Sequence, residues 1–127
     1  MGLRNASLAG LAIALYVAAG LALGHHSIGG EFSNEEVTVE GVVREFALIN
    51  PHTYIVIEVG AGGQTEAWTL TLGPATKLIR GSGWTPTSLV EGERVTATGR
   101  AARRGKGMYI ARLIKADGTA LIETLEE

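Results

Sequence analysis

The sequence predicts a mainly β protein, a small closed barrel with one short helix. Two observations indicate this class: five stretches rich in β-branched and aromatic residues are separated by Gly, Pro and Asn turns, and a Pro-opened helical segment stands between the third and fourth of them. A third observation is that the chain has no cysteine. A domain of this size without disulfides depends on its own core, which a closed sheet provides.

Residues 1–24 have the layout of a secretory signal. One positive charge, Arg4, precedes an uncharged, Ala- and Leu-rich run over residues 6–23, and small residues stand at its end, at Ala22 and Gly24. We expect cleavage after Gly24 and a periplasmic or secreted protein. The run also reaches the length of a membrane-spanning helix, so an N-terminal hydrophobic helix retained as an inner-membrane anchor is the alternative. Either way, Arg4 favours export of the domain.

The mature chain is expected to begin with an N-terminal arm over residues 25–34, and the barrel domain is expected over residues 35–127. Residues 35–48 alternate between apolar and polar side chains, which is typical of a long half-buried strand. Gly41 in its middle indicates a bulge or bend, as a small barrel needs.

A turn at Asn50-Pro51 separates the first strand from the second. The second strand is predicted over residues 52–59 and the third over residues 64–72. The glycine-rich residues 60–63 between them form a hairpin loop.

Pro74 opens a short helix over residues 75–80, and Gly81 is expected to cap its C-terminus. Pro86 opens a further single helical turn. These elements form the connection between the third and fourth strands.

The fourth and fifth strands are predicted over residues 94–100 and 108–116, joined by a flexible hairpin at residues 105–107. Asp117 and Gly118 then make a tight turn. Three strands, a helical connection and two strands are the order of a five-stranded OB-like Greek-key barrel. A β-sandwich is the alternative, but it usually has more strands.

Several short motifs, in this order along the chain, give a family likeness. They are His25-His26-Ser27, Asn50-Pro51-His52, Gly81-Ser82-Gly83-Trp84-Thr85 and Asp117-Gly118. With them the chain resembles a family of exported bacterial proteins of unknown function, whose members share a signal peptide, an HHS start, an NPH turn, a GW-T helix and a late DG turn. The likeness covers essentially the whole mature chain. It implies location and fold class, and it supplies no biochemical activity.

The three histidines, His25, His26 and His52, are the candidate metal ligands. After cleavage, His25 would offer its α-amine and imidazole in one chelate ring, and a second imidazole would complete a set of nitrogens. Nitrogen-rich tetragonal sites suit Cu(II), so copper is the expected metal. The structural alternative is that His25 and His26 belong to signal processing and that His52 fixes the turn by a hydrogen bond.

Other residues are weaker candidates for ligand contacts. Glu31 could add an oxygen ligand to a metal. Asn50 and Tyr54 border the first inter-strand loop, which flanks the usual ligand face of an OB barrel. They could contact a small molecule, although a purely structural turn is the simpler interpretation.

Basic residues gather near the last hairpin, at Arg100, Arg103, Arg104 and Lys106. A solvated hairpin is the default interpretation, and contact with lipid phosphates or an acidic partner is an alternative. With a formal net charge of −2, the chain gives no reason to expect nucleic acid as a partner.

The sequence contains none of the common nucleophile motifs, so we expect a non-enzymatic protein. Two functions stand nearly level: a copper-binding exported protein, and a binding or accessory subunit of a membrane protein, held by an uncleaved helix. Trp68 and Trp84 are expected to be core anchors. The sequence does not indicate an oligomeric state.

Overall fold

The computed structural model describes residues 27–123 of the chain. The chain divides into two compact units, residues 1–31 and residues 32–127. In the first unit, α2 (Ser27–Glu31) is a single short helix. The predicted signal or anchor, residues 1–24, lies outside the described residues. Within the described part, no helix is both long and apolar enough to cross a membrane.

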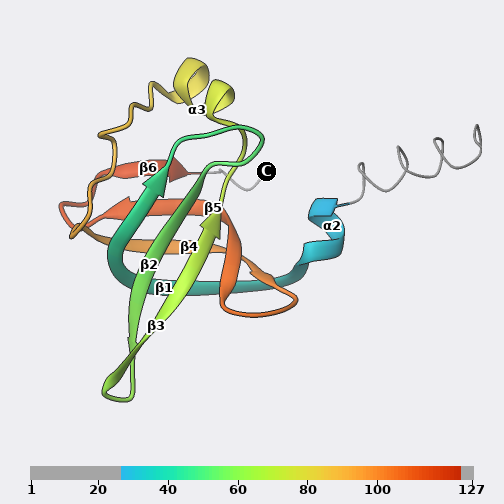
Figure 1. Cartoon of the computed structure of the whole chain (residues 1–127), viewed down its shortest axis with the longest axis vertical. Helices are drawn as coiled ribbons and strands as arrows, with labels where there is room; N and C mark the ends of the chain where they lie inside the picture. The colour runs from blue at the N-terminus through green and yellow to red at the C-terminus, as the bar shows by residue number, and fades with distance from the viewer. Residues whose placement is uncertain (1–26, 124–127) are drawn as a thin grey trace, which may run out of the picture. The chain divides into compact units, whose positions relative to one another are not determined.

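Five strands of the second unit close into a barrel (Figure 1). They are β1 (Phe32–Ala47), β2 (Tyr54–Ala61), β3 (Gln64–Thr71), β4 (Arg94–Ala102) and β5 (Gly107–Lys115). Antiparallel pairings give the order β3-β2-β1-β4-β5, and a short parallel pairing of β3 with β5 closes the ring. This connectivity is that of an OB barrel. The predicted fold class is therefore confirmed.

β1 is long enough to pair with two neighbours in succession. Its first part pairs with β4 and its last part with β2, and Val42 stands at the change, opposite both Arg94 and Glu58. Gly41 lies just before this point, where a Cβ atom would come 2.5 Å from the backbone oxygen of Glu58. The glycine therefore allows two strands to approach closely at the bend.

β1 begins at Phe32, three residues before the expected start at residue 35. The reason is packing: Phe32 pairs with Ala102 of β4, its ring meets that of Tyr109 edge to face at 5.6 Å, and it is buried. The alternating pattern of the sequence is weak here because residues 33–36 are polar.

The core fills the barrel with inward-facing side chains from every strand of the ring and from the β3–β4 connection. Its fully buried members are Val43, Ile55, Ile57, Leu70, Leu72, Leu89, Val95, Ala97, Met108 and Leu113. Trp84 is also buried and packs edge to face on Phe46, with ring centroids 5.7 Å apart. Trp68 is only half-buried. Trp84 is therefore a core residue as expected, whereas Trp68 packs against the core from a half-buried position.

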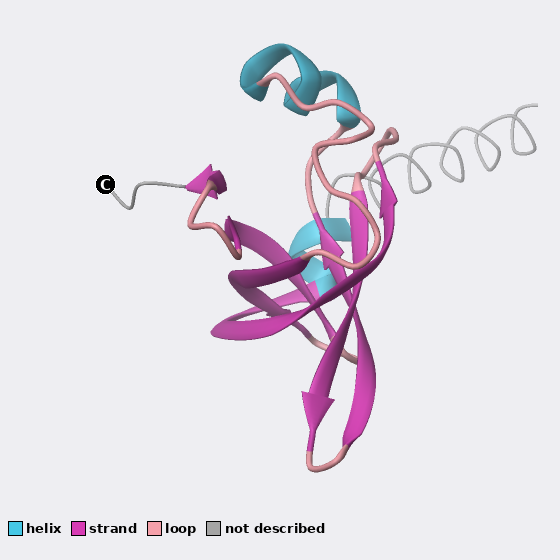
Figure 2. Cartoon of the chain, turned by 90° about the vertical axis from the view of Figure 1, so that its left-hand side faces the viewer, coloured by secondary structure: helices cyan, strands magenta, loops and turns pink. Residues whose placement is uncertain are grey.

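Helix α3 (Ala75–Ser82) connects β3 to β4, as predicted, and lies at the end of the barrel opposite the β2–β3 hairpin (Figure 2). It ends later than expected. Gly83, with φ of 68°, is the left-handed cap. Its N–H donates to the carbonyl of Ile79 at 3.1 Å, and the N–H of Trp84 donates to the carbonyl of Leu78 at 3.3 Å. Gly81 stays within the last turn of the helix.

A sixth strand was not predicted. β6 (Ala120–Glu123) follows the expected Asp117-Gly118 turn and pairs antiparallel with β5, at residues 112–114. β3 occupies the same edge of β5 only at residues 107–109. The remaining part of that edge is therefore open to β6, which lies outside the five-stranded ring.

Candidate functional site

The turn that carries His52 is tied to both β3 and α3. Thr53, fully buried, donates its backbone N–H to the carbonyl of Gly73 at 3.0 Å and accepts the N–H of Leu72 at 2.9 Å. The carbonyl of Ile49 accepts the N–H of Ala75 at 3.1 Å and the hydroxyl of Thr53 at 3.3 Å. The turn is consequently a fixed part of the barrel end.

His52 itself is half-buried, and its Nδ1 lies 3.3 Å from the backbone oxygen of Leu72. A carbonyl can only accept a hydrogen bond, so this contact places the proton on Nδ1. The lone pair of Nε2 has no partner among the described residues. The hydrogen bond to Leu72 agrees with the predicted structural role of His52 in fixing the turn. It also leaves the second ring nitrogen, Nε2, able to bind a metal ion.

Asn50 has a structural role. Its side-chain oxygen accepts the N–H of Thr76 at 3.3 Å, in the first turn of α3. One of the N–H groups that a helix start leaves unpaired is thereby satisfied. Asn50 therefore links the turn to α3. Of its two predicted roles, ligand contact and structural support of the turn, the structure shows the second.

We expect Asn50→Ala to lower the free energy of unfolding by about 1 kcal/mol, the usual cost of losing a side-chain cap. Urea denaturation of the variant measures this. Asn34→Ala is a matched control, because the Asn34 side chain is exposed and makes no hydrogen bond within the described chain. Equal stability of the two variants would contradict the capping role.

Tyr54 begins β2 and points its hydroxyl at Glu45 of β1, donating a hydrogen bond to Oε1 at 2.5 Å. This hydrogen bond, and secondarily the negative charge of Glu45, raise the pKa of Tyr54 above its ordinary value. The hydroxyl expected to contact a ligand is therefore engaged within the sheet.

The predicted metal ligands are only partly within the described residues. His25 and His26 lie outside them, and Glu31 is exposed at the end of α2, in the first unit. Within residues 27–123 no group of three or more His, Cys, Asp or Glu side chains is gathered to hold a metal ion. Of the three histidines, His52 alone is placed by the structure.

An open groove of about 850 Å³ lies over the outer faces of β1, β4 and β5. Its floor includes Thr38 and Thr98, whose hydroxyls are 2.8 Å apart. Arg112 on its wall forms an ion pair with Glu123 at 3.5 Å. The groove is therefore lined by both positively and negatively charged side chains, and their charges partly neutralise one another.

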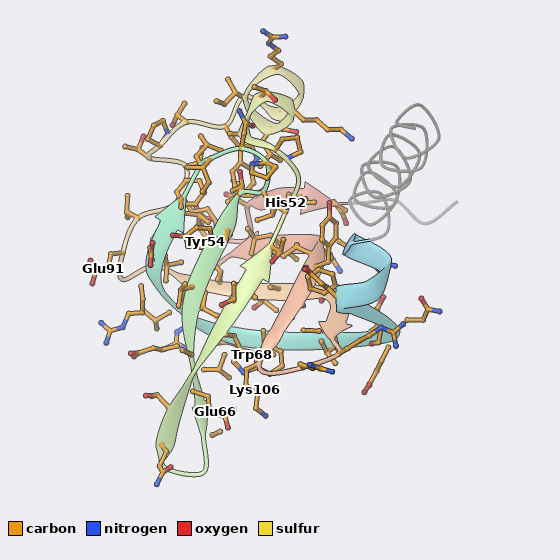
Figure 3. All side chains as sticks on the ribbon, turned by 45° about the vertical axis from the view of Figure 1, so that its right-hand side comes forward. His52, Tyr54, Glu66, Trp68, Glu91 and Lys106 are labelled. Atoms are coloured by element: carbon orange, nitrogen blue, oxygen red, sulfur yellow. The ribbon has the colours of Figure 1, made fainter. Side chains whose placement is uncertain are left out.

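On another part of the barrel, Trp68, Glu66 and Lys106 lie together (Figure 3). The Lys106 ammonium is 3.6 Å from a carboxylate oxygen of Glu66 and 5.8 Å from the centre of the Trp68 ring. The indole N–H of Trp68 is buried, and within the described chain it has no hydrogen-bond partner. Lys106 thus covers one face of a half-buried aromatic ring.

Sequence reasoning missed the partners that fix the histidine turn. The carbonyl of Leu72 and the buried hydroxyl of Thr53 hold it, but backbone carbonyls leave no signature in a sequence. Pro74 was the one available indication of these contacts, because it predicts that a helix begins directly after β3.

Comparison with known proteins shows the family to which this chain belongs. A model of a family of unknown function, DUF6152, matches residues 13–111. The chain belongs to that family. No curated protein matches it. An uncharacterised family was expected, and this part of the expected resemblance is confirmed.

Solved structures with a similar fold include two crystal forms of Rim1, a mitochondrial single-stranded DNA-binding protein of S. cerevisiae. One form is 17% identical, with a TM-score of 0.49, and the match covers 68% of this chain and 95% of Rim1. The other form is 15% identical, with a TM-score of 0.48, and the match covers 76% of this chain and 100% of Rim1. At such identities the likeness concerns the fold alone.

One expectation about partners needs correction. The sequence gives no reason to expect nucleic acid as a partner, whereas both of these structural neighbours are described as single-stranded DNA-binding proteins. A mild net charge describes the whole chain and says nothing about one local surface, so it is not a ground for that exclusion. The exclusion of nucleic acid as a partner is accordingly withdrawn.

Proposed function

We propose that this small OB barrel is an exported, non-catalytic protein that binds Cu(II) through His25, His26 and His52. The observation that carries the proposal is the state of His52. Its ring is held on a fixed turn by Leu72, and Nε2 is left with a lone pair. Histidines that bind metals commonly donate their other ring N–H to a backbone carbonyl in this way.

The other two ligands follow from the leader. Cleavage after Gly24 would make His25 the first residue, so that its amine and imidazole could close one chelate ring on the metal. His26 would add a second imidazole. Cu(II) accepts nitrogen ligands in tetragonal geometry, which is why it is preferred here to zinc.

The same leader supports the proposed location. A single basic residue, an uncharged apolar run and small residues before His25 are the parts of an export signal. In this proposal the mature protein acts in the periplasm by holding a metal, and it does not catalyse a reaction.

The test is a Cu(II) titration of the mature chain recovered from an exporting cell, followed by electron paramagnetic resonance. We expect one tetragonal, nitrogen-ligated Cu(II) per chain. His25→Ala and His52→Ala should each weaken binding about tenfold or more, because even supporting groups of metal sites contribute that much. Asn34→Ala, at an exposed residue outside the turn, keeps all three histidines and the turn itself and is the matched control. Unchanged affinity and spectrum in both histidine variants would contradict the proposal.

A further inference from the structure

The hairpin between β4 and β5 concentrates positive charge. Four of the chain's eleven Lys and Arg residues lie within residues 100–106, and that stretch has no acidic residue. We use the name basic hairpin for these four residues, Arg100, Arg103, Arg104 and Lys106. No role in the copper proposal accounts for them.

The two residues at its tip are available to a partner. Arg103 and Arg104 are exposed, and neither has an ion pair or hydrogen bond with the described part of the chain. Arg100 lies over the ring of Tyr109, 6.0 Å from its centre, and Lys106 is engaged with Glu66. Two guanidinium groups, each able to bind a phosphate through paired N–H donors, therefore face solvent.

The barrel holds this hairpin in place. The carbonyl of Lys106 accepts the N–H of Thr69 from β3 at 3.1 Å, and Gly107 packs so closely on β3 that a Cβ atom would come 2.9 Å from the oxygen of Thr69. Because the hairpin is anchored at its base, binding would require little further ordering of the backbone.

The basic hairpin is also where the chain enters the barrel. Phe32, the first residue of β1, pairs with Ala102, and the hydroxyl of Ser33 donates to the carbonyl of Ala101 at 3.1 Å. The apolar run of the leader ends at Leu23, nine residues before Phe32. Even a fully extended connection spans only about 30 Å. A leader that is in the membrane therefore keeps this hairpin close to the lipid surface.

Each aromatic ring beside the hairpin is half-buried and has a cation over one face. Tyr109 meets Phe32 and lies under Arg100, while Lys106 lies over Trp68. Binding of single-stranded nucleic acid relies on bases that stack on open aromatic faces. Because the rings beside them are engaged, the exposed guanidinium groups of Arg103 and Arg104 suit the phosphate groups of a membrane surface better than unpaired bases.

We propose that the basic hairpin docks the barrel on the anionic phospholipid surface of the membrane that the leader enters. Each Lys or Arg near an anionic bilayer adds attraction, and the attraction weakens with salt. The inference is independent of copper binding. The attraction of the charges acts whether the leader is retained or removed, and a retained leader adds the tether.

The test uses single-cysteine labels, since the chain has no cysteine of its own. A fluorophore on Asn34→Cys reports from the strand beside the hairpin, and one on Ser82→Cys reports from the far end of α3. The protein, in the form that the exporting cell makes, is mixed with vesicles that carry a headgroup quencher. One set contains phosphatidylglycerol with phosphatidylethanolamine, and the other contains phosphatidylcholine alone.

We expect quenching of the Asn34 label by the phosphatidylglycerol vesicles, little by phosphatidylcholine, and none at Ser82. Arg103→Gln with Arg104→Gln should raise the lipid concentration for half-quenching about thirty-fold, as two cations at about 1 kcal/mol each imply. The matched control is Lys77→Gln with Arg80→Gln on α3, which removes the same charge and should change that concentration less than about twofold.

Three results would overturn the proposal. The first is equal quenching of both labels. The second is quenching that does not depend on phosphatidylglycerol. The third is binding of a single-stranded oligonucleotide through Arg103 and Arg104 without any response to the vesicles, which would assign the surface to nucleic acid.

Discussion

Ile57→Ala is expected to destabilise the barrel by about 3 kcal/mol or more. Ile57 lies in the middle of β2, its side chain is fully buried, and it packs in the core with residues of the other strands. Truncating it removes buried apolar atoms and leaves a cavity that a closed ring of strands cannot easily collapse. For a domain of this size the loss corresponds to a fall in Tm of more than about 10 °C.

The matched control is Val56→Ala. Val56 directly precedes Ile57 in the same strand, so its side chain points to the other face, and it is half-buried. We expect its loss to cost less than about 1 kcal/mol. Urea denaturation with an unchanged slope measures both values. If the two variants were equally stable, the assignment of inner and outer faces in β2 would be wrong.

Gly99→Ala is expected to have an effect of similar size for a different reason. A Cβ atom at residue 99 would come 2.1 Å from the backbone oxygen of Tyr109 and 3.0 Å from the Cα of Ile110. The register of β4 with β5 shifts at this point, between Thr98 and Gly99. Since the obstacle is backbone, the strands themselves must move, and we expect a loss of about 3 kcal/mol.

Gly60→Ala provides the control for this prediction. Gly60 also lies in a strand, but no atom lies within 4 Å of a Cβ built there. The same substitution should change stability by less than about 1 kcal/mol and could be stabilising, because it restricts the unfolded chain. A Gly99→Ala variant as stable as Gly60→Ala would contradict the close approach of β4 and β5.

The fold could be predicted because its signals are local. Alternation placed the five strands of the ring, and Pro74 placed the helix between β3 and β4. The predicted strands are wrong where residues far away in the sequence determine whether a segment joins the sheet. Phe32 joins β1 because its ring packs on Tyr109 and its backbone pairs with Ala102. β6 forms because the edge of β5 is unpaired at residues 112–114 until β6 pairs with it.

The candidate site was less predictable for the same reason. The sequence could nominate His52 by its residue type, but the contact that orients its ring is a backbone carbonyl of Leu72, which no side-chain pattern marks. Likewise, Asn50 was nominated as a ligand contact and instead caps α3. The positions of His25 and His26 stay predictions from the leader alone.

The central claim, an exported barrel that holds copper at its mature N-terminus, is tested most directly by the intact mass of the protein recovered from an exporting cell. The measurement is made on soluble and membrane fractions, before and after addition of Cu(II). We predict a chain that begins at His25 and retains one copper ion, which is lost in His25→Ala. A chain that begins at Met1 in the membrane fraction, with no copper retained, would contradict the claim.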